Sequence, residues 1–418
     1  MNFGKKCLLV FLCLLIPYLV VEVIYSLLCR YGITNLPPDT VWLFEESGRT
    51  IQFDPIRGVH LTTNPSRFIR MNEGVVEYIG TYRGNNQGFP DRDDFSPERS
   101  TGDRIRIAVF GDSFTAAQYV EMNWPDRVED LSRTAPCSLD LLNFSVDGAG
   151  LANWWSILIR LVQEENYKID GIIFAVYQND LRRKFTMYEH RDYRSHMFGR
   201  TDSWDPKDWP KTLPQACDYI SPADSTYILS ESSFQSVIDG SQRSISRRPW
   251  RPYFLLQIVS LARRTFEDNS HGLGDSSRRD VGKSDGDSSL SEQISLVKEI
   301  GEFARTRALP VLVVRIASRK ELISGSPPSW EVCRFAKLLD AQFINGDEAF
   351  RELSRKDIRS MFFPYDGHWN QAGSDRFARF MLEIIREWIC AQPSGLLDPL
   401  SRDVSGSIFG QNVSASLS

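Results

Sequence analysis

A serine, a histidine and an aspartate in this sequence have the types and local settings that nucleophilic catalysis requires. Ser113 follows an expected buried strand at 104–111, at the turn into a helical pattern, where open α/β sheets place reactive groups. Asp366 and His368 lie two residues apart before the last helical pattern, so both side chains can point the same way in an extended loop. Asp366 could hold the Nδ1 proton of His368 and leave Nε2 as the base that a serine nucleophile needs. The alternative is an ordinary Asp-Ser turn, with His368 only capping a helix.

Two further strand ends supply groups that could stabilise an oxyanion. An expected strand at 139–146 ends shortly before Gly148, and an expected strand at 171–177 ends shortly before Asn179. The carboxyl ends of neighbouring parallel strands meet at one edge of a sheet. We therefore expect the backbone N–H groups of Ser113 and Gly148 and the side-chain amide of Asn179 to face an attacked carbonyl. Taken alone, each of these segments could also be a turn without function.

The elements expected to position these residues alternate between strands and helices. Short apolar runs predict buried strands at 104–111, 139–146, 171–177, 310–316 and 342–345. Apolar residues at helical spacing predict helices at about 124–131, 152–165, 294–305, 330–339 and 371–388. This alternation predicts an α/β domain built on a parallel, doubly wound sheet.

The expected domain has two halves, separated by an insertion. The halves are 104–181 and 291–392, and residues 182–290 interrupt the strand-helix rhythm between them. Within this insertion, 268–289 has almost no apolar residues and is expected to be disordered. We expect 30–103 to form a stalk and lead-in edge structure, with a strand at 75–82, and 393–418 to form a flexible tail.

The amino-terminal region has the pattern of a membrane anchor. Residues 7–29 are almost wholly apolar, and Lys5 and Lys6 precede them. As a helix rising ~1.5 Å per residue, this run reaches about 34 Å, enough to cross a bilayer core. No small-residue cleavage site follows it, so we expect a retained signal anchor. The positive-inside rule places residues 1–6 in the cytoplasm and the rest of the chain outside it.

Composition excludes some partners and leaves other questions open. A net charge of −5 gives no reason to expect nucleic acid as a partner. The cysteines form no CxxC pair and no zinc-type cluster, so neither a metal nor a cofactor is expected. The basic run at 182–184 could contact an anionic substrate or form a solvated loop. Four cysteines could form disulfides in an oxidising compartment, but their spacing does not decide whether they do: Cys137, Cys217, Cys333 and Cys390.

Four segments together resemble the SGNH hydrolase superfamily, also called GDSL esterases and lipases. They are GDSF (111–114), NFSVDGAG (143–150), QND (178–180) and DGHWN (366–370). The lead-in NNQGFPDRDD (85–94) is similar to membrane-anchored bacterial members, which implies the bacterial inner membrane. The resemblance implies a three-layer αβα sandwich with a flavodoxin-like sheet. It also implies that Ser113 is the nucleophile, that Gly148 and Asn179 complete the oxyanion hole, and that Asp366 and His368 complete the triad.

Two departures from the usual pattern bear on the substrate. Asp366 and His368 are two residues apart where the common final block has three, a form similar to polysaccharide O-acetyltransferases and acetylesterases. Tyr177 stands where the third block usually has glycine, which is expected to narrow the site.

The leading hypothesis is therefore hydrolysis of an ester, an O-acyl group on a cell-envelope glycan, through an acyl-Ser113 intermediate. One alternative is an O-acetyltransferase that moves the acyl group onto a polysaccharide. The other is a catalytically silent glycan-binding protein on the same fold. The sequence leaves the oligomeric state open.

Overall fold

The computed structural model of this chain describes residues 15–25, 40–45, 51–72, 75–99, 104–134, 137–183, 185–191, 194–198, 219–220, 225–244, 290 and 293–390. The expected disordered segment 268–289 and the expected tail 393–418 lie outside these residues, as does much of the expected insertion at 182–290.

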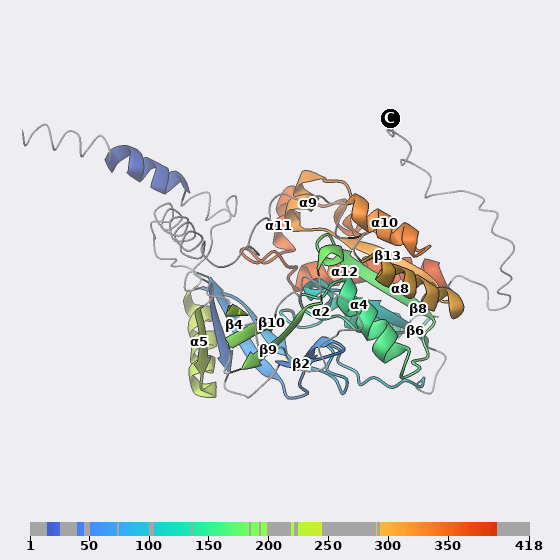
Figure 1. The fold of residues 1–418 in the computed structure, drawn as a ribbon. Helices are drawn as coiled ribbons and strands as arrows, with labels where there is room; N and C mark the ends of the chain where they lie inside the picture. The colour runs from blue at the N-terminus through green and yellow to red at the C-terminus, as the bar shows by residue number, and fades with distance from the viewer. Residues whose placement is uncertain are drawn as a thin grey trace, which may run out of the picture.

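A five-stranded parallel sheet forms the centre of the domain (Figure 1). Its strands are β6 (Ile105–Phe110), β7 (Leu139–Asn143), β8 (Gly171–Tyr177), β13 (Val311–Ile316) and β14 (Gln342–Asn345). They lie in the order β14-β13-β8-β6-β7, and every neighbouring pair is parallel. Numbered along the chain, this is the flavodoxin-type order 2-1-3-4-5 of a doubly wound sheet. The predicted parallel α/β sheet is confirmed.

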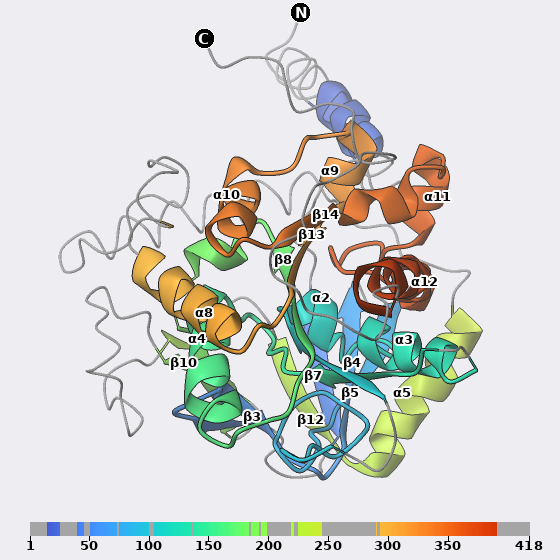
Figure 2. The ribbon, with the colours of Figure 1, turned by 90° about the vertical axis from the view of Figure 1, so that its right-hand side faces the viewer.

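Helices cover both faces of this sheet, because its strands are apolar on both sides. Ile107 and Val109 of β6 pack with α3 (Trp124–Ser132) and α12 (Gln371–Ile385). Ala108 and Phe110 point the other way and pack with α4 (Leu151–Ile157), α8 (Ile294–Thr306) and α10 (Trp330–Leu338). Figure 2 shows these two helix layers on opposite sides of the strands.

Short helices and turns complete the parallel domain at its edges. They are α2 (Ser113–Ala116), η1 (Leu158–Val162), η2 (Asp180–Arg182), α9 (Arg319–Ser324), η5 (Gly346–Phe350), α11 (Arg355–Ser360) and η6 (Arg386–Cys390). The predicted helix at 152–165 is α4 continued by the π-helical turn η1, which ends at Val162.

A second sheet stands beside the parallel one, at the left of Figure 1. Its order is β12-β1-β4-β5, with β1 (Thr40–Glu45), β4 (Ser66–Asn72), β5 (Val75–Tyr82) and β12 (Ser225–Leu229). The pairs β1–β4 and β4–β5 are antiparallel, and β1–β12 is parallel. The predicted strand at 75–82 is confirmed as β5. Much of the region expected to be a stalk and edge structure thus belongs to a separate sheet, which also takes a strand from the expected insertion.

The remaining elements flank these two sheets. A small hairpin pairs β2 (Ile51–Asp54) with β3 (Gly58–Leu61), and a three-stranded sheet holds β9 (Met187–Arg191), β10 (Arg194–Phe198) and β11 (Tyr219–Ile220). The helix α5 (Glu231–Ser244) packs on the four-stranded sheet, where Phe234 is buried with Leu43 and Ile69.

The structure describes the expected membrane anchor at 7–29 only between residues 15 and 25, which are helical. Residues 7–14 and 26–29 lie outside the described part of the chain. Among the described residues, no helix has both the length and the apolar character needed to cross a bilayer.

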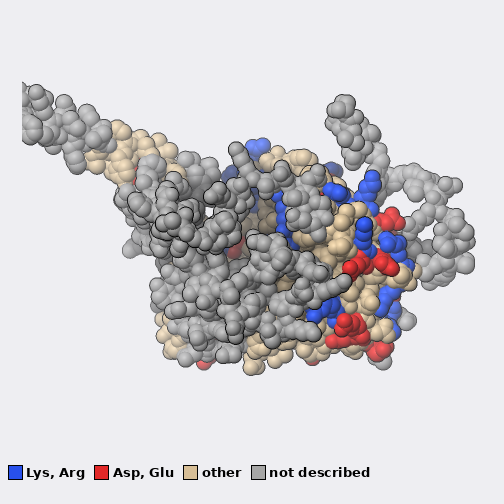
Figure 3. Space-filling view, viewed as in Figure 1, with Lys and Arg blue, Asp and Glu red and all other residues tan. Residues whose placement is uncertain are grey.

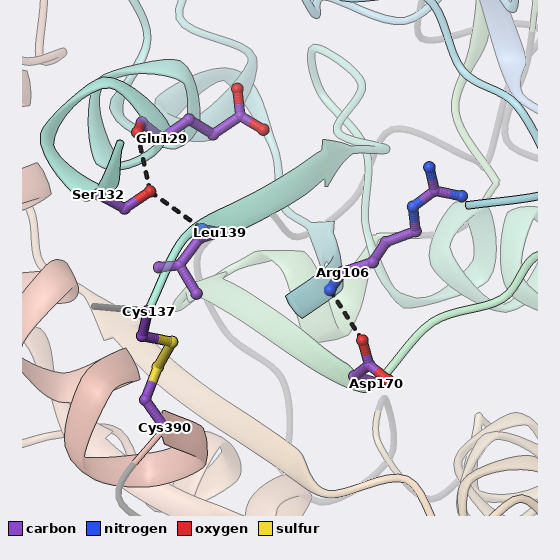
Figure 4. Close-up of a disulfide and its surroundings, with 7 residues drawn as sticks. All are labelled: Arg106, Glu129, Ser132, Cys137, Leu139, Asp170 and Cys390. Carbon is purple, nitrogen blue, oxygen red and sulfur yellow. Dashed lines mark hydrogen bonds between the residues drawn. A yellow bond between two sulfur atoms is a disulfide. The ribbon is translucent and has the colours of Figure 1, made fainter. Parts of the chain in front are cut away.

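One disulfide ties the parallel domain together. Cys137, just before β7, is bonded to Cys390, the last residue of η6, across a sequence separation of 253 (Figure 4). Close by, Ser132 links α3 to β7, because its hydroxyl accepts from the Leu139 N–H and donates to the Glu129 carbonyl. Cys333 is a free, exposed thiol, and Cys217 lies outside the described residues.

Candidate active site

The nucleophile candidate Ser113 lies on a sharp turn from β6 into α2. Asp112 caps this short helix, because its carboxylate accepts the Phe114 N–H at 2.9 Å. Gly111 allows the turn to close, since an added Cβ would lie 2.3 Å from the Thr115 hydroxyl. Ser113 is therefore the first residue of α2, at the carboxyl edge of the parallel sheet.

The structure brings Ser113, His368 and Asp366 into one hydrogen-bonded chain. Ser113 Oγ lies 2.7 Å from His368 Nε2, and His368 Nδ1 lies 2.5 Å from Asp366 Oδ1. The backbone N–H of His368 also donates to Asp366 Oδ1, at 3.2 Å, which fixes the loop between the two residues. The structure thus brings the three predicted residues together in the order of contacts that a Ser-His-Asp triad has, and their catalytic roles stay a prediction.

The charges around His368 favour its protonated form. Burial by itself lowers the pKa of His368, but the hydrogen bond and charge of Asp366, with further charges at Asp147 and Asp112, raise it above its ordinary value. Burial would raise the pKa of Asp366, yet His368, Arg70 and Tyr78 together hold it well below its usual range. These interactions favour the ionised form of Asp366, and its charge in turn favours the protonated form of His368.

Three side chains of the four-stranded sheet contact the Asp366 carboxylate or the backbone of its loop. Arg70 of β4 forms an ion pair with Asp366 Oδ2, and the Tyr78 hydroxyl of β5 donates to the same oxygen at 2.8 Å. Glu77 Oε1 accepts the backbone N–H groups of Tyr365 and Asp366, at 2.6 and 2.8 Å. Glu77 also lies 3.4 Å from Arg70. No local pattern in the sequence indicates these residues, because Tyr78 and its partner Asp366 are 288 positions apart.

Of the other two predicted oxyanion-hole residues, Gly148 lines the cavity at Ser113, whereas Asn179 is not among the residues that line it. Gly148 has φ +70° and lines the same cavity as Ser113 and His368. Its carbonyl accepts the Thr186 hydroxyl at 2.8 Å. Asn179 is exposed where η2 begins, and no side-chain hydrogen bond in the described part of the chain joins it to Ser113 or His368. Its oxyanion role stays a prediction.

An ion-paired arginine links the loops that surround Ser113. Arg183 Nη1 lies 3.2 Å from Asp112, 3.0 Å from Asp180 and 3.0 Å from the Ala149 carbonyl. Burial raises the pKa of Asp180, and the neighbouring charge of Asp112 raises it further. Arg182 is engaged as well, because its Nε lies 2.9 Å from Glu331. These two arginines of the basic run therefore serve structural ion pairs.

Two cavities meet at Ser113 and His368. The larger one, about 940 Å³, extends over Gly148 toward α9 and α11. The smaller one, about 310 Å³, extends toward the four-stranded sheet, and its wall includes the rings of Trp42, Phe68 and Tyr119. Ser113 and His368 are exposed to both cavities, so a substrate bound at the serine can place one part in each.

Tyr177, the residue at the usual glycine position, lines the larger cavity. Its ring stacks on Phe114 with centroids 5.2 Å apart, and Phe114 in turn lies 4.8 Å from the His368 ring. The aromatic ring therefore occupies space beside the triad that a glycine would leave open.

No protein-family model matches this sequence, and no curated protein matches it. Some solved structures do. A mutant of the esterase AlinE4 is 13% identical, over 59% of this chain and 77% of the esterase, with a TM-score of 0.25. A lipase/acylhydrolase from Enterococcus faecalis is 10% identical, over 68% of this chain and 96% of the other, with a TM-score of 0.31. The function proposed below therefore rests on the geometry of the site.

Proposed function

We propose that this protein is a serine esterase that cleaves its substrate through an acyl-Ser113 intermediate. The observation that carries the proposal is the continuous contact from Ser113 Oγ through His368 to Asp366, at 2.7 and 2.5 Å. A serine hydroxyl is a weak nucleophile at neutral pH, and an imidazole in this position removes its proton as it attacks. If His368 only capped a helix, neither of these two short contacts would be required.

The reaction proceeds in two halves on these residues. Ser113 Oγ attacks the ester carbonyl and passes its proton to His368 Nε2, and the imidazolium then returns that proton to the departing alcohol. In the second half, His368 takes a proton from water, the resulting hydroxide attacks the acyl carbon, and the acid leaves as Ser113 recovers its proton. The Asp366 carboxylate stays ionised throughout and holds the Nδ1 proton.

The backbone N–H groups of Ser113 and Gly148 are the donors for the oxyanion in this proposal. Ser113 is the first residue of α2, so its N–H has no acceptor within the helix. Gly148 lines the same cavity and has no side chain to cover its backbone. Asn179 would supply the third donor if its side chain turns toward the cavity when substrate binds.

The proposed substrate is an O-acyl group on a cell-envelope glycan. A cavity of about 940 Å³ beside Ser113 suits a sugar rather than a small alcohol. The bond between Cys137 and Cys390 is typical of proteins outside the cytoplasm. Together with the apolar run at 7–29, it supports a single-pass bacterial inner-membrane protein with a cytoplasmic amino terminus and an extracytoplasmic catalytic domain.

Acyl transfer to a polysaccharide is the second candidate, because the two-residue spacing of Asp366 and His368 is similar to polysaccharide O-acetyltransferases as well as to acetylesterases. The same residues would act, with a sugar hydroxyl replacing water in the second half-reaction. A silent glycan-binding protein would not need the Ser113–His368 contact.

The test uses the purified full-length chain with Ser113→Ala and His368→Ala. Each protein is treated with a fluorophosphonate probe and assayed on p-nitrophenyl acetate, with and without a sugar acceptor. We expect labelling of wild type on Ser113 and loss of turnover in both variants. Ser236→Ala, an exposed serine on α5, is the matched control. Acetylated sugar in place of free acetate would favour transfer, and a folded wild-type protein with neither labelling nor turnover would contradict both enzymatic proposals.

A further inference from the structure

One wall of the larger cavity is basic. Arg319 and Lys320 of α9 and Arg359 of α11 line it, together with Ser113 and His368. The helices α9 and α11 pack against each other, so the three cations form one surface. Figure 3, viewed from the same side as Figure 1, shows Lys and Arg side chains at the upper edge of the described surface, near the position of α9.

These cations differ from the other arginines near the site. Arg183 and Arg182 are paired with carboxylates, as described above. Within the described part of the chain, by contrast, no ion pair involves Lys320 or Arg359, and both are exposed. The cavity wall therefore holds positive charge that the described residues leave unpaired.

Arg319 adds a fixed, half-buried charge to this surface. Its Nη1 donates to the carbonyls of Phe363 and Pro364, both at 3.0 Å, which anchors it beside the loop that carries His368. Burial lowers the pKa of Arg319, and the positive charge of Arg359 lowers it further, against the attraction of Glu77 and Asp366. An anion bound between Arg319 and Arg359 would relieve this repulsion.

Other residues that line the two cavities are acidic or aromatic. Asp147 lines both cavities close to Ser113, and its negative charge acts on His368. An anionic group next to the serine would be repelled by Asp147. The smaller cavity, with Trp42 and Phe68 in its wall, suits an apolar acyl group instead.

We propose that Arg319, Lys320 and Arg359 bind an anionic group on the alcohol part of the ester, so that the substrate is an acylated glycan carrying a carboxylate or a phosphate. The inference rests on the proposed ester hydrolysis and adds the class of alcohol. The acyl group lies in the aromatic cavity, the ester carbonyl at Ser113, and the charged sugar against α9 and α11. Guanidinium groups suit both anions, because they offer paired N–H donors.

The test compares three acetylated sugars on the purified full-length chain. A mono-O-acetylated methyl glucoside is the neutral substrate, and the corresponding glucuronide and glucoside 6-phosphate carry the two anions on the same ring. The double variant Lys320→Gln/Arg359→Gln removes the unpaired charges. Arg355→Gln/Lys356→Gln is the matched control, since both residues are exposed on α11 and neither lines the cavity.

We expect wild type to prefer at least one anionic sugar over the neutral one in kcat/KM, mainly through a lower KM. This ratio should fall about fivefold to tenfold in the cavity double variant, stay at the wild-type value in the control, and shrink as salt is added. Whichever anionic sugar shows the preference identifies carboxylate or phosphate as the group bound.

Two results would overturn the inference and can be told apart. If the neutral sugar ester is hydrolysed as well as both anionic ones, and the double variant does not change the ratio, the basic wall does not select the alcohol, while ester hydrolysis stands. If no acetylated sugar and no p-nitrophenyl acetate is hydrolysed by folded wild-type protein, the proposed function fails and this inference fails with it.

Discussion

The two sheets of this molecule contribute to the site in different ways. The parallel sheet presents Ser113 and Gly148 at the ends of its strands, where the chain must turn and the backbone is accessible. No described residue of the four-stranded sheet is hydrogen-bonded to Ser113 or His368, but Arg70, Glu77 and Tyr78 hold Asp366 and its loop. Trp42 and Phe68 of this sheet line the smaller cavity. In the proposed reaction, the parallel sheet supplies the reacting groups and the four-stranded sheet fixes the position of Asp366, so substitutions in the two sheets should differ in the size and kind of their effects.

The largest effect is expected from Ser113→Ala. Removing the nucleophile should lower kcat by about 10⁵–10⁶-fold, as it does when members of a triad act as a unit. The measurement is steady-state hydrolysis of p-nitrophenyl acetate, with unfolding monitored by circular dichroism. A decrease below tenfold, in a folded variant, would mean that the parallel sheet does not supply the nucleophile.

Asp366→Asn should have the next largest effect, on the order of 10⁴-fold in kcat, because the amide no longer holds the Nδ1 proton of His368 in place. The same substitution removes the carboxylate that pairs with Arg70 of the four-stranded sheet, so it tests both regions together. We would measure kcat beside the free energy of unfolding. A large loss of stability with unchanged kcat would assign Asp366 a structural role only.

Arg70→Met tests the four-stranded sheet directly. Loss of the ion pair should misplace Asp366 and lower kcat by roughly 10²-fold with little change in KM. Tyr78→Phe removes one hydrogen bond to the same carboxylate and should cost about tenfold.

The control for both is Arg67→Met on the same strand. Arg67 forms an ion pair with Glu45, at 2.5 Å, whereas Arg70 forms one with Asp366. It should change stability and leave kcat near the wild-type value. If Arg67→Met and Arg70→Met lowered kcat equally, the four-stranded sheet would act through stability alone.

The pH dependence of kcat/KM tests which charges raise the pKa of His368. The base must be neutral, so kcat/KM should rise with pH as His368 loses its proton, with a midpoint above the ordinary histidine value because the pKa is raised. Asp147→Asn removes one of the charges that raise this pKa, so the midpoint should move to lower pH. A midpoint that stays in place would show that Asp147 does not act on the imidazole.

The smallest effect on activity is expected from opening the disulfide. Cys137→Ser/Cys390→Ser should lower the free energy of unfolding by about 2–5 kcal/mol, because the bond closes a long loop, and should leave kcat/KM within about twofold. Thermal unfolding with and without reductant measures the first quantity. A strong loss of activity at a temperature where the variant is folded would connect this edge of the sheet to the site.

The sequence was informative where function depends on local pattern. A buried apolar run that ends at Gly111 and Asp112 predicts both strand β6 and the turn that exposes Ser113. The short spacing of Asp366 and His368 predicts that they act together. These features need only residues that are close in the chain, so no knowledge of packing is required.

Long-range packing explains what the sequence did not reveal. Strand β5 was predicted from its alternation, but nothing near Tyr78 indicates that its hydroxyl reaches Asp366. The same holds for Lys320 and Arg359, which belong to different helices and share a cavity only after folding. Arg183 shows the converse. The basic run to which it belongs could have contacted a substrate or formed a solvated loop, but the structure pairs Arg183 with Asp112 and Asp180.

The most direct test of the central claim is to detect the acyl-enzyme. Wild-type protein is mixed rapidly with p-nitrophenyl acetate, quenched in acid, digested and examined by mass spectrometry. The account predicts a burst of p-nitrophenol no larger than one equivalent and an acetyl group on the peptide that contains Ser113, with neither in Ser113→Ala. Steady turnover with an acetyl group on another residue, or with full activity retained in Ser113→Ala, would contradict it.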